Sequence, residues 1–553
     1  MTVFGRSWMD FSHVAPKRSI SKALSQSLNS KRPGKGFTTN ATITLSLFEG
    51  LNYRYDRNKN QYPKGLRPVR KVYVRSFATG DGGQADTSTG GLVHWVVEQG
   101  GLVQGVAIHS WHGEDGGSGL GLRATRRIHM GEELVVLPES LHLTYRKETD
   151  PTRELVQLMD RIPEELWGAK LAVKLIHERL KGQDGFFWPY IANLPVGFPG
   201  LPLFFESDAI RLIEYPSVSH QIIKRCKWLL QFSEKELKSS PSFSNIDANA
   251  FAWAFAAVTS RAFRPGGPTS PGTMLPLIDM CNHSFAPNAR VVGTSRPGDL
   301  AMLASKDIQE NEPILLSYGK LPNDFLLLDY GFVVDGNPYD TVTLGFDVGF
   351  VEAAKAVANV GSMLDDSSSS PKLTSWQKKL LDSLGVLTNK EVNIIWTSSS
   401  DNNGCPVDDR LLAAVRVLCA TKEADCKKYI LTDFNTYLPS SWEVSSCKTL
   451  IGMCLVALSQ FSCSSQQDSV QLENANGDNA KLAIQLRRGK KDLLSNAMKL
   501  LKQRIQLVEQ QRNKATNSPA SSKSSGARNK KASTSASYGK DAQKSKGFQP
   551  KRI

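Results

Sequence analysis

Two clusters of polar and aromatic residues carry the groups in this 553-residue sequence that are best suited to chemistry. Asn282 and His283 offer an amide and an imidazole, while Tyr318 and Tyr330 offer phenols that stay uncharged near neutral pH. Neither cluster has the spacing of a nucleophile elbow, a metal cage or a phosphate loop. These residue types instead predict a pocket with aromatic walls and polar tips, which suits a cation.

Short strands and a helical segment must position these residues. Apolar runs separated by turn residues predict strands at 103–108, 121–124, 134–137, 290–292, 301–303 and 314–316. Residues 154–249 have a mainly helical pattern, and Phe251–Phe263 is apolar enough to be a buried helix. Arg261 near the end of so apolar a helix must reach either a carboxylate or solvent.

Several short motifs in these clusters resemble those of a known family. They are Gly119-Leu120-Gly121-Leu122-Arg123-Ala124, Asn282-His283-Ser284, Pro287-Asn288, Tyr318-Gly319 and Asp329-Tyr330-Gly331-Phe332. In this order they resemble the motifs of SET-domain methyltransferases. The last motif is most similar to the group typified by the plant, plastid-type Rubisco large-subunit lysine methyltransferase.

The resemblance implies an α+β fold with two bodies. A SET-type β fold with a helical insertion is expected first, and a C-terminal α-helical substrate-binding domain follows it. The expected divisions are a transit peptide at 1–76, a linker at 77–90, the SET domain at 91–340 with its insertion at about 150–250, the helical domain at 341–511, and a disordered basic tail at 512–553.

The last predicted helix has a narrow apolar seam. Its members recur with spacings of four and three residues, and they are Leu494, Met498, Leu501, Ile505 and Val508. Packing inside a helical domain is the favoured interpretation, and a coiled-coil partner is the alternative.

The resemblance also implies roles for individual residues. The expected ligand is S-adenosylmethionine, and the residues expected to hold it are Ser118, Gly119, Leu120, Arg261, Asn282, His283 and Tyr330. Tyr318 and Tyr330 are expected to be catalytic. The target side chain is expected to meet Arg261, Arg264, Asp279 and Tyr318. The family commonly has a Glu where Ser118 stands, and a substrate-contacting Tyr of the group is missing near Val292–Ser295.

Simpler interpretations stand beside these roles. The glycine-rich stretch 113–121 is also typical of a hairpin turn. Arg261 could extend to solvent from a helix end, and Tyr330 could be a core aromatic residue with its hydroxyl bonded. Asp279 could cap a helix or turn.

Methyl transfer to a lysine imposes one chemical requirement on such a pocket. The amine must lose its proton, which costs about 4 kcal/mol near pH 7.5 for a lysine with its ordinary pKa. Burial beside a positive sulfonium favours the neutral amine, and oxygen atoms of the pocket can aim its lone pair. Tyr318 is the residue expected to provide the main oxygen.

The positive charge of the chain lies at its two ends. Residues 1–76 contain 15 Lys and Arg against 3 Asp and Glu, and residues 512–553 contain 11 against 1. The remainder has 42 basic against 49 acidic residues. Nucleic-acid binding by the folded body is therefore not expected, apart from non-specific contact through the tail.

The basic, acid-poor N-terminal segment is typical of a transit peptide, and a disordered extension is the alternative. Chloroplast stroma is the expected location because the resembled enzymes are plastid proteins. No apolar run predicts a membrane span. The eight cysteines include no Cys-x-x-Cys pair, so no metal is expected.

The function expected from the sequence is S-adenosylmethionine-dependent methylation of a lysine in a stromal protein, such as the Rubisco large subunit or a metabolic enzyme. A protein-histidine methyltransferase of the same fold is the first alternative. The second is a catalytically idle SET scaffold that binds a protein partner or, through its tail, plastid nucleic acid.

Overall fold

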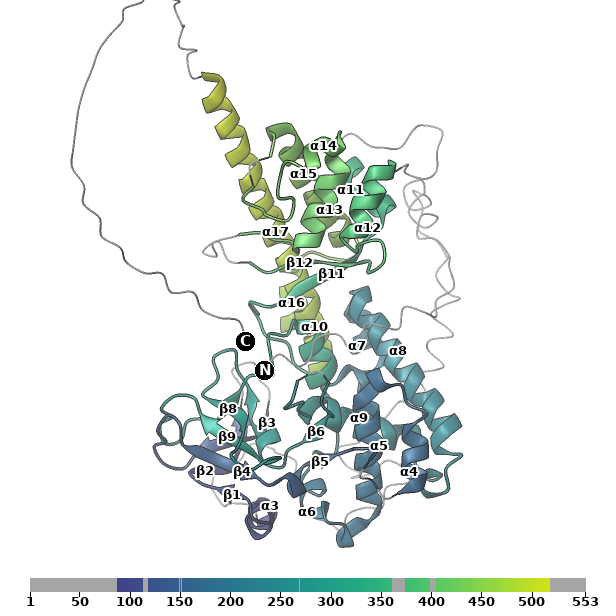
Figure 1. The fold of residues 1–553 in the computed structure, drawn as a ribbon, viewed down its shortest axis with the longest axis vertical. Coiled ribbons are helices and arrows are strands. Elements are labelled where there is room, and N and C mark those ends of the chain that lie inside the picture. Colours follow the sequence, from purple (N-terminus) through teal and green to yellow (C-terminus); the bar gives the residue numbers. More distant parts are fainter. Residues whose placement is uncertain are drawn as a thin grey trace, which may run out of the picture.

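The computed structural model describes residues 87–112, 118–148, 150, 152–267, 269–360, 373–397, 404–436 and 438–517. The predicted transit peptide at 1–76 and residues 518–553 of the predicted tail lie outside this part of the chain. Figure 1 shows a lower β-containing body and an upper helical body, which the long helix α17 (Asp478–Asn517) joins along one side. No helix in the described residues is both long enough and apolar enough to cross a membrane.

The β-containing body is built from small antiparallel sheets. Its four-stranded sheet has the order β1-β4-β9-β8, with β1 at Leu102–Val103, β4 at Glu133–Leu137, β9 at Leu300–Ala304 and β8 at Ala289–Gly293. Beside it lie a hairpin of β2 (Val106–His112) and β3 (Ser118–Ala124), and a pair of β5 (Leu143–Thr144) and β6 (Thr273–Met274). The strands are short because Gly and charged turns interrupt each apolar run. All six predicted strands of this body fall on observed strands, although β1 and β2 divide the first of them at Gly105.

One strand pair departs from the antiparallel pattern. The two residues of β7 (Asn282–His283) lie parallel to β10 (Leu315–Leu316), so that Asn282 faces Leu315 and His283 faces Leu316. Asn288 stabilises this crossing, because its side-chain amide donates to the Pro313 carbonyl and its oxygen accepts from the Leu315 N–H. The pairing brings together two segments that are far apart in sequence.

The helical insertion packs against this sheet system. Its helices are α4 (Arg153–Met159), α5 (Trp167–Leu180), α6 (Trp188–Ile191), α7 (Ser207–Leu212), α8 (Pro216–Phe232) and α9 (Ala248–Arg261). Asp247 caps α9 by accepting from the Ala250 N–H, and all but three of the 14 helix residues are buried. An apolar circumference of this kind belongs to a central helix. The buried helix predicted at Phe251–Phe263 is therefore observed as α9, at Ala248–Arg261.

The upper body consists of one strand pair and a helical bundle. β11 (Thr341–Gly345) pairs antiparallel with β12 (Glu391–Ile395), and β12 was not predicted. The helices are α11 (Val348–Val357), α12 (Ser375–Ser383), α13 (Asp409–Cys419), α14 (Glu423–Cys426), α15 (Ser440–Leu458), α16 (Ser465–Glu473) and α17. The seam of α17 packs against α15, with Leu494 and Leu501 fully buried, so it serves the core of this body.

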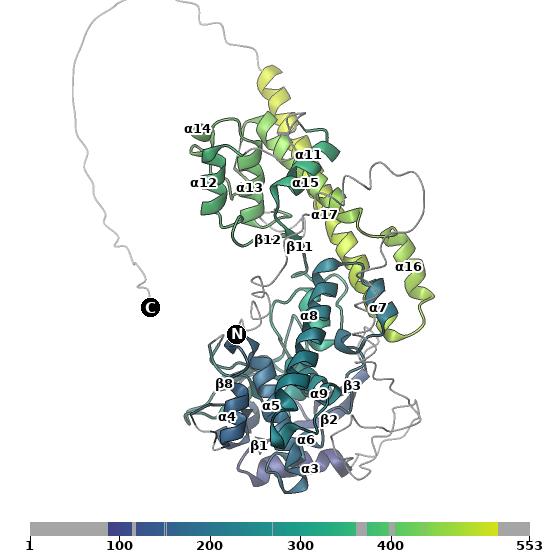
Figure 2. The same cartoon turned by 90° about the vertical axis from the view of Figure 1, so that its right-hand side faces the viewer.

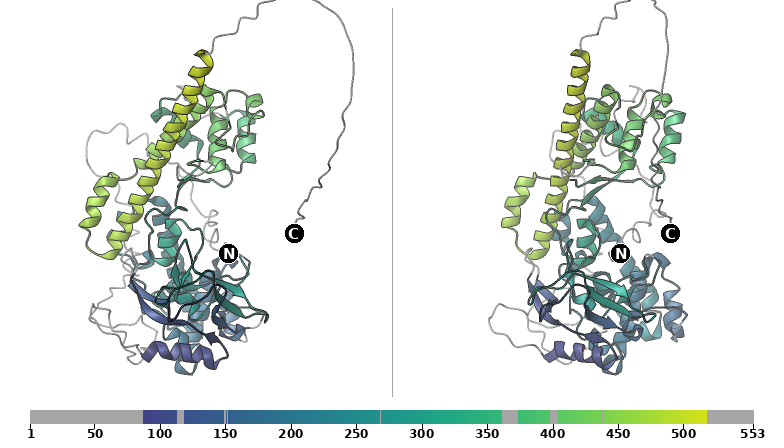
Figure 3. Two further views of the ribbon diagram at one scale, coloured as in Figure 1. Left: turned by 90° about the vertical axis from the view of Figure 1, so that its left-hand side faces the viewer. Right: turned by 60° about the vertical axis from the view of Figure 1, so that its left-hand side comes forward.

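The two bodies are less separate than the sequence predicted. Helix α7 and the first half of α8 bury their apolar side chains in the same core as the upper helices, through residues such as Ile213, Val218 and Ile222. Figure 2 shows α7 beside the lower end of α17, and Figure 3 shows α17, in yellow, running from the upper body to the lower one. Part of the insertion thus contributes apolar side chains to the core of the upper body.

Two predicted boundaries are wrong by a few residues. The linker expected at 77–90 overlaps α3 (Thr87–Glu98), because Leu92, Trp95 and Val96 bury one face and the preceding residues complete its first turn. Residues 512–517 of the predicted disordered tail are helical, since α17 continues to Asn517 beyond its last packed turn. Extending an existing helix costs little when the added residues are good helix formers such as Lys and Arg.

Candidate functional site

The β7–β10 crossing places the two chemical clusters of the sequence in one site. The backbone N–H of Tyr318 donates to His283 Nδ1 at 3.1 Å, and the Tyr318 hydroxyl donates to the Cys281 carbonyl at 2.8 Å. These two bonds fix the backbone and the tip of Tyr318 against the segment that carries Asn282. The tyrosine is therefore held at both ends by the Asn-His cluster.

Tyr330 reaches the same place from a tight turn. The single π-helical turn η8 (Leu326–Tyr330) ends at Gly331, whose φ is 81°, a left-handed conformation that glycine adopts readily. A Cβ on Gly331 would lie 2.8 Å from the backbone of Gly200, so the close approach also requires glycine. The Tyr330 ring stacks on Tyr318 with centroids 4.5 Å apart and planes 24° apart. π-Turns of this kind often occur at functional sites.

Further aromatic rings extend the wall beyond the two tyrosines. His283 lies edge-on to Phe285 with centroids 4.5 Å apart, and Phe332 is 6.2 Å from both His283 and Tyr330. Tyr339 contacts Phe285 at 5.2 Å. Sequence reasoning did not select Phe285, Phe332 or Tyr339. Phe332 belongs to a quoted motif, and Phe285 and Tyr339 lie near the motifs in sequence, but aromatic residues are also common in cores.

The polar groups of this wall are uncharged near neutral pH. Burial lowers the pKa of His283 to about 4, against a smaller opposing effect of the Leu316 carbonyl. Burial raises the pKa of the Tyr318 phenol although the charge of Arg261 opposes the rise, and burial likewise raises the pKa of Tyr330. The site therefore offers neutral hydrogen-bonding groups, and His283 does not have the pKa of a general base near pH 7.

Two buried nitrogen atoms on β7 have no partner among the described residues. They are Asn282 Nδ2 and His283 Nε2. Since Nδ1 of the neutral His283 ring accepts from the Tyr318 N–H, the ring proton belongs on Nε2. Asn282 Nδ2 and His283 Nε2 are therefore both donors. A buried donor without a partner costs about 1–3 kcal/mol. Adjacent donors of this kind fit a ligand that is rich in hydrogen-bond acceptors.

Asp279 and Arg261 meet behind this wall. Asp279 Oδ2 accepts from the Tyr190 hydroxyl at 2.7 Å and lies 3.3 Å from Arg261 NH1, and the Asp279 side chain has no exposed surface. The Arg261 side chain is 19% exposed and also donates to the Asp279 carbonyl. Arg261 therefore reaches a carboxylate and does not simply extend into solvent. A substrate-binding role for Asp279 stays a prediction, and its observed contacts position Arg261.

The structure places the remaining predicted residues at different distances from the site. β3 carries Ser118, Gly119 and Leu120, and it packs against the 3₁₀ turn η7 (Ile278–Met280), directly before Asn282. No described atom lies within 4 Å of a Cβ built on Gly119, so the strand is open there. Residues 113–117 of the glycine-rich stretch lie outside the described residues. Gly119 and Gly121 belong to a strand of the β2–β3 hairpin.

Arg264 has contacts away from the tyrosines. Its Nε donates to the Ser270 carbonyl at 2.8 Å, and its guanidinium lies 5.3 Å from the centre of the Trp167 ring. Tyr190, which bonds Asp279, was not found by sequence reasoning, because nothing in Trp188-Pro189-Tyr190 identifies a distant partner. No group of three His, Cys, Asp or Glu residues within the described ranges could hold a metal ion.

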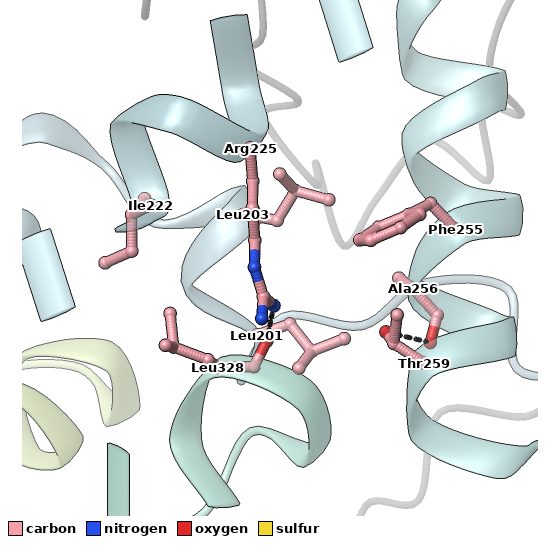
Figure 4. A pocket seen from close by; sticks show the side chains of 8 residues that line it. All are labelled: Leu201, Leu203, Ile222, Arg225, Phe255, Ala256, Thr259 and Leu328. Carbon is pink, nitrogen blue, oxygen red and sulfur yellow. Dashed lines mark hydrogen bonds between the residues drawn. The ribbon is translucent and has the colours of Figure 1, made fainter. Parts of the chain in front are cut away.

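A small cavity lies close to this site but is not its ligand pocket. It is lined by Leu201, Leu203, Ile222, Arg225, Phe255, Ala256, Thr259 and Leu328, and it leaves about 10 Å³ for the centre of a water molecule. Figure 4 shows the Arg225 side chain reaching across it towards the backbone of Leu328, with the residues of α9 on the opposite side. Space of this size holds about one water molecule.

Comparisons with known proteins identify two domain families along this chain. Residues 119–319 match the SET domain family, and residues 368–494 match the Rubisco LSMT substrate-binding family. Crystal structures of the SET domain of LSMT bound to lysine and AdoHcy, and of Rubisco LSMT bound to AdoMet, superpose with TM-scores of 0.56 and 0.55. Each is 17% identical to this chain, and the matches cover 78% of it and 95% and 96% of the respective neighbours. This likeness shows the fold.

The chain therefore joins a SET domain to a Rubisco LSMT substrate-binding domain, as the motifs predicted. Among curated proteins, the actin-histidine N-methyltransferases of Homo sapiens and Mus musculus are similar to it. Each is 26% identical over 462 residues, which cover 78% of this chain and 71% of the relative.

Proposed function

We propose that this protein is an S-adenosylmethionine-dependent protein-lysine N-methyltransferase that acts on a stromal protein of the chloroplast. The observation that carries this proposal is the uncharged wall of Tyr318 and Tyr330 beside two buried, unpartnered donors in a SET domain. The wall suits an amine acceptor, and the donors suit a cofactor.

S-adenosylmethionine fits the donors that the chain presents. Its adenine nitrogens, ribose oxygens and carboxylate can accept hydrogen bonds. The donors Asn282 Nδ2 and His283 Nε2 have no acceptor within the described chain. Open space beside Gly119 on β3 allows a ligand to approach the backbone closely. When bound, this cofactor supplies an electrophilic methyl group on a positive sulfonium.

Residues of this chain would orient the acceptor amine and keep it uncharged. Tyr318 and Tyr330 remain neutral phenols, so their oxygens can orient an amine lone pair without fixing a proton on it. The wall contributes no negative charge that would stabilise a lysine ammonium, and burial favours the neutral amine. The Rubisco LSMT substrate-binding domain at 368–494 would hold the target protein.

Histidine is the second candidate acceptor, since the similar relatives are actin-histidine N-methyltransferases. An imidazole needs no deprotonation near pH 7.5, so the same neutral wall would serve it. The substrate protein and the location in the stroma rest on the resemblance of the motifs and on the basic N-terminal segment.

The first experiment is a calorimetric titration of S-adenosylmethionine into the full chain, with Asn282→Ala as the matched variant. Binding in the micromolar range that is weakened in Asn282→Ala supports the cofactor site, and absence of heat from folded protein favours the idle scaffold.

The second experiment offers tritiated cofactor with stromal extract and, separately, with purified actin. Amino-acid analysis of the labelled protein separates methyllysine from methylhistidine. Tyr318→Phe provides the blank, and label in methylhistidine alone would replace the lysine assignment.

A further inference from the structure

A buried arginine of the helical insertion contacts the turn that carries Tyr330. Arg225 lies on α8, and its NH1 donates to Asp329 Oδ1 at 2.6 Å and to the Leu328 carbonyl at 2.9 Å. The two side chains are 4% and 8% exposed, so this ion pair is shielded from solvent. Both acceptors belong to η8, and the next residue in the chain is Tyr330.

The contact stands at the C-terminal end of the π-turn. The last carbonyl groups of a helical turn lack partners within it, and a cation is favourable there. Gly331 donates to Leu327, and Phe332 donates to Leu326, whereas the Leu328 carbonyl accepts from Arg225. The guanidinium thus gives the Leu328 carbonyl a hydrogen-bond partner from outside the turn.

The turn borders the small cavity on the side that faces α9. The small cavity separates Leu328 from Phe255, Ala256 and Thr259 of α9, as Figure 4 shows. Arg225 restrains the turn by two directed bonds from the opposite helix.

We infer that Arg225 is a positioning residue for Tyr330, an inference that rests on the proposed function. By holding Leu328 and Asp329, it sets the Tyr330 ring against Tyr318, 4.5 Å away. The helical insertion then contributes directly to the geometry of the catalytic wall. Displacement of a catalytic group by about 1 Å can reduce a rate about a hundredfold, so the restraint matters.

The test uses the full chain with its 13 tyrosines replaced by 3-fluorotyrosine. The fluorine signal of Tyr330 is assigned by its loss in Tyr330→Phe, and that of Tyr318 by its loss in Tyr318→Phe. The variants are Arg225→Met, Arg225→Lys and the milder Asp329→Asn, which keeps the shape of the side chain if Arg225→Met does not fold.

The matched control is Arg416→Met. Arg416 on α13 forms an equally buried pair with Glu443 on α15, with NH2 and Oε1 2.9 Å apart and 0% and 1% of the side chains exposed. It bonds Leu431, Asp433 and Glu443, which all lie in the upper body. If Arg225→Met acts only through a general loss of stability, Arg416→Met should change the Tyr330 signal equally. If Arg225 positions Tyr330, Arg416→Met should leave that signal unchanged.

The expected result is a shifted or broadened Tyr330 signal in Arg225→Met and Asp329→Asn, with partial recovery in Arg225→Lys, whose ammonium can reach one of the two acceptors. An unchanged Tyr330 signal in Arg225→Met and Asp329→Asn, or an equal change in Arg416→Met, would overturn the inference. This readout needs no acceptor protein, so it decides about Arg225 even if the proposed function fails.

The rate of methyl transfer gives the second readout. With the acceptor that becomes labelled in the assay above, Arg225→Met should lower kcat about tenfold. The KM for the acceptor and the affinity for S-adenosylmethionine should stay within about twofold. A displaced Tyr330 with an unchanged kcat would reject the positioning role, while a chain that methylates nothing would reject the proposed function alone.

Discussion

The candidate site is half-buried and the junction between α17 and the SET domain is buried, and their polar groups differ in how they are paired. At the site, Asn282 and His283 keep uncharged donors without partners in the described chain. At the junction, Lys490 is fully buried, donates to Asp340 at 2.7 Å and lies 2.5 Å from Asp324. Every charge there faces an opposite charge.

A second group at the junction follows the same rule. Arg487 of α17 pairs with Asp468 of α16 and with Glu214 next to α7, at 2.8 and 3.0 Å. Paired buried charges hold segments in place, because removing one partner leaves the other uncompensated. An unpartnered buried donor instead costs free energy, which a bound ligand with an acceptor can recover. The junction thus differs from the site in that its buried charges are paired with opposite charges.

The largest expected effect concerns the junction. Lys490→Met should lower the free energy of unfolding by about 3–5 kcal/mol, because Asp324 and Asp340 would stay buried without a cation. Denaturant unfolding measures this, with the exposed Lys502→Met on the same helix as the control. A loss below about 1 kcal/mol would place the junction among ordinary surface pairs.

Tyr318→Phe should act on the reaction rather than on the fold. Removal of the hydroxyl should lower kcat about a hundredfold or more, since a positioned oxygen is lost. Cofactor affinity should stay within about twofold, and stability should fall by about 1 kcal/mol with the bond to Cys281. Parallel losses of rate and cofactor affinity would instead place Tyr318 in the cofactor site.

Asn282→Ala should weaken the binding of S-adenosylmethionine about five- to tenfold, the value of one hydrogen bond from a buried donor. Folding stability should hold or rise slightly, because the unpartnered Nδ2 is removed. Calorimetry and denaturant unfolding together measure the two effects. A destabilised variant with unaltered affinity would assign Asn282 to the supporting class.

The buried imidazole predicts a pH dependence with a definite sign. The pKa of His283 is about 4 in the folded chain, below its ordinary value of about 6.5. As pH falls from 6.5 to 4, the unfolded chain takes up a proton that the folded chain does not, so folding stability declines in this window. The difference between the wild type and His283→Gln isolates this effect, and identical profiles would contradict it.

The smallest effect is expected from the C-terminal segment. Deletion of residues 518–553 should leave cofactor affinity and methyl transfer within about twofold, because α17 ends at Asn517 after the last residues packed into the core. The measurement compares the truncated and full chains in the same assay. A marked loss of activity would show that the basic segment takes part in substrate binding.

Much of the site was readable from the chain. The motifs with Asn282, His283, Tyr318 and Tyr330 do lie together, because short strands with turns between them admit few arrangements. Most strands and the seam of α17 were also predicted, since apolar periodicity reports which face is buried. Helix ends at Thr87 and Asn517 were missed because periodicity does not define termini.

The supporting partners were out of reach of sequence reasoning. Arg225, Tyr190 and Lys490 have the residue types of ordinary surface or core positions, and nothing near them in sequence identifies Asp329, Asp279 or Asp340 as a partner. Their burial depends on how α8, α6 and α17 pack. A sequence pattern reports local chemistry and the face of an element, whereas pairing across elements arises only when the chain is folded. The motifs therefore predicted the type of site. The contacts that hold it in place form only in the tertiary structure, between residues far apart in the chain.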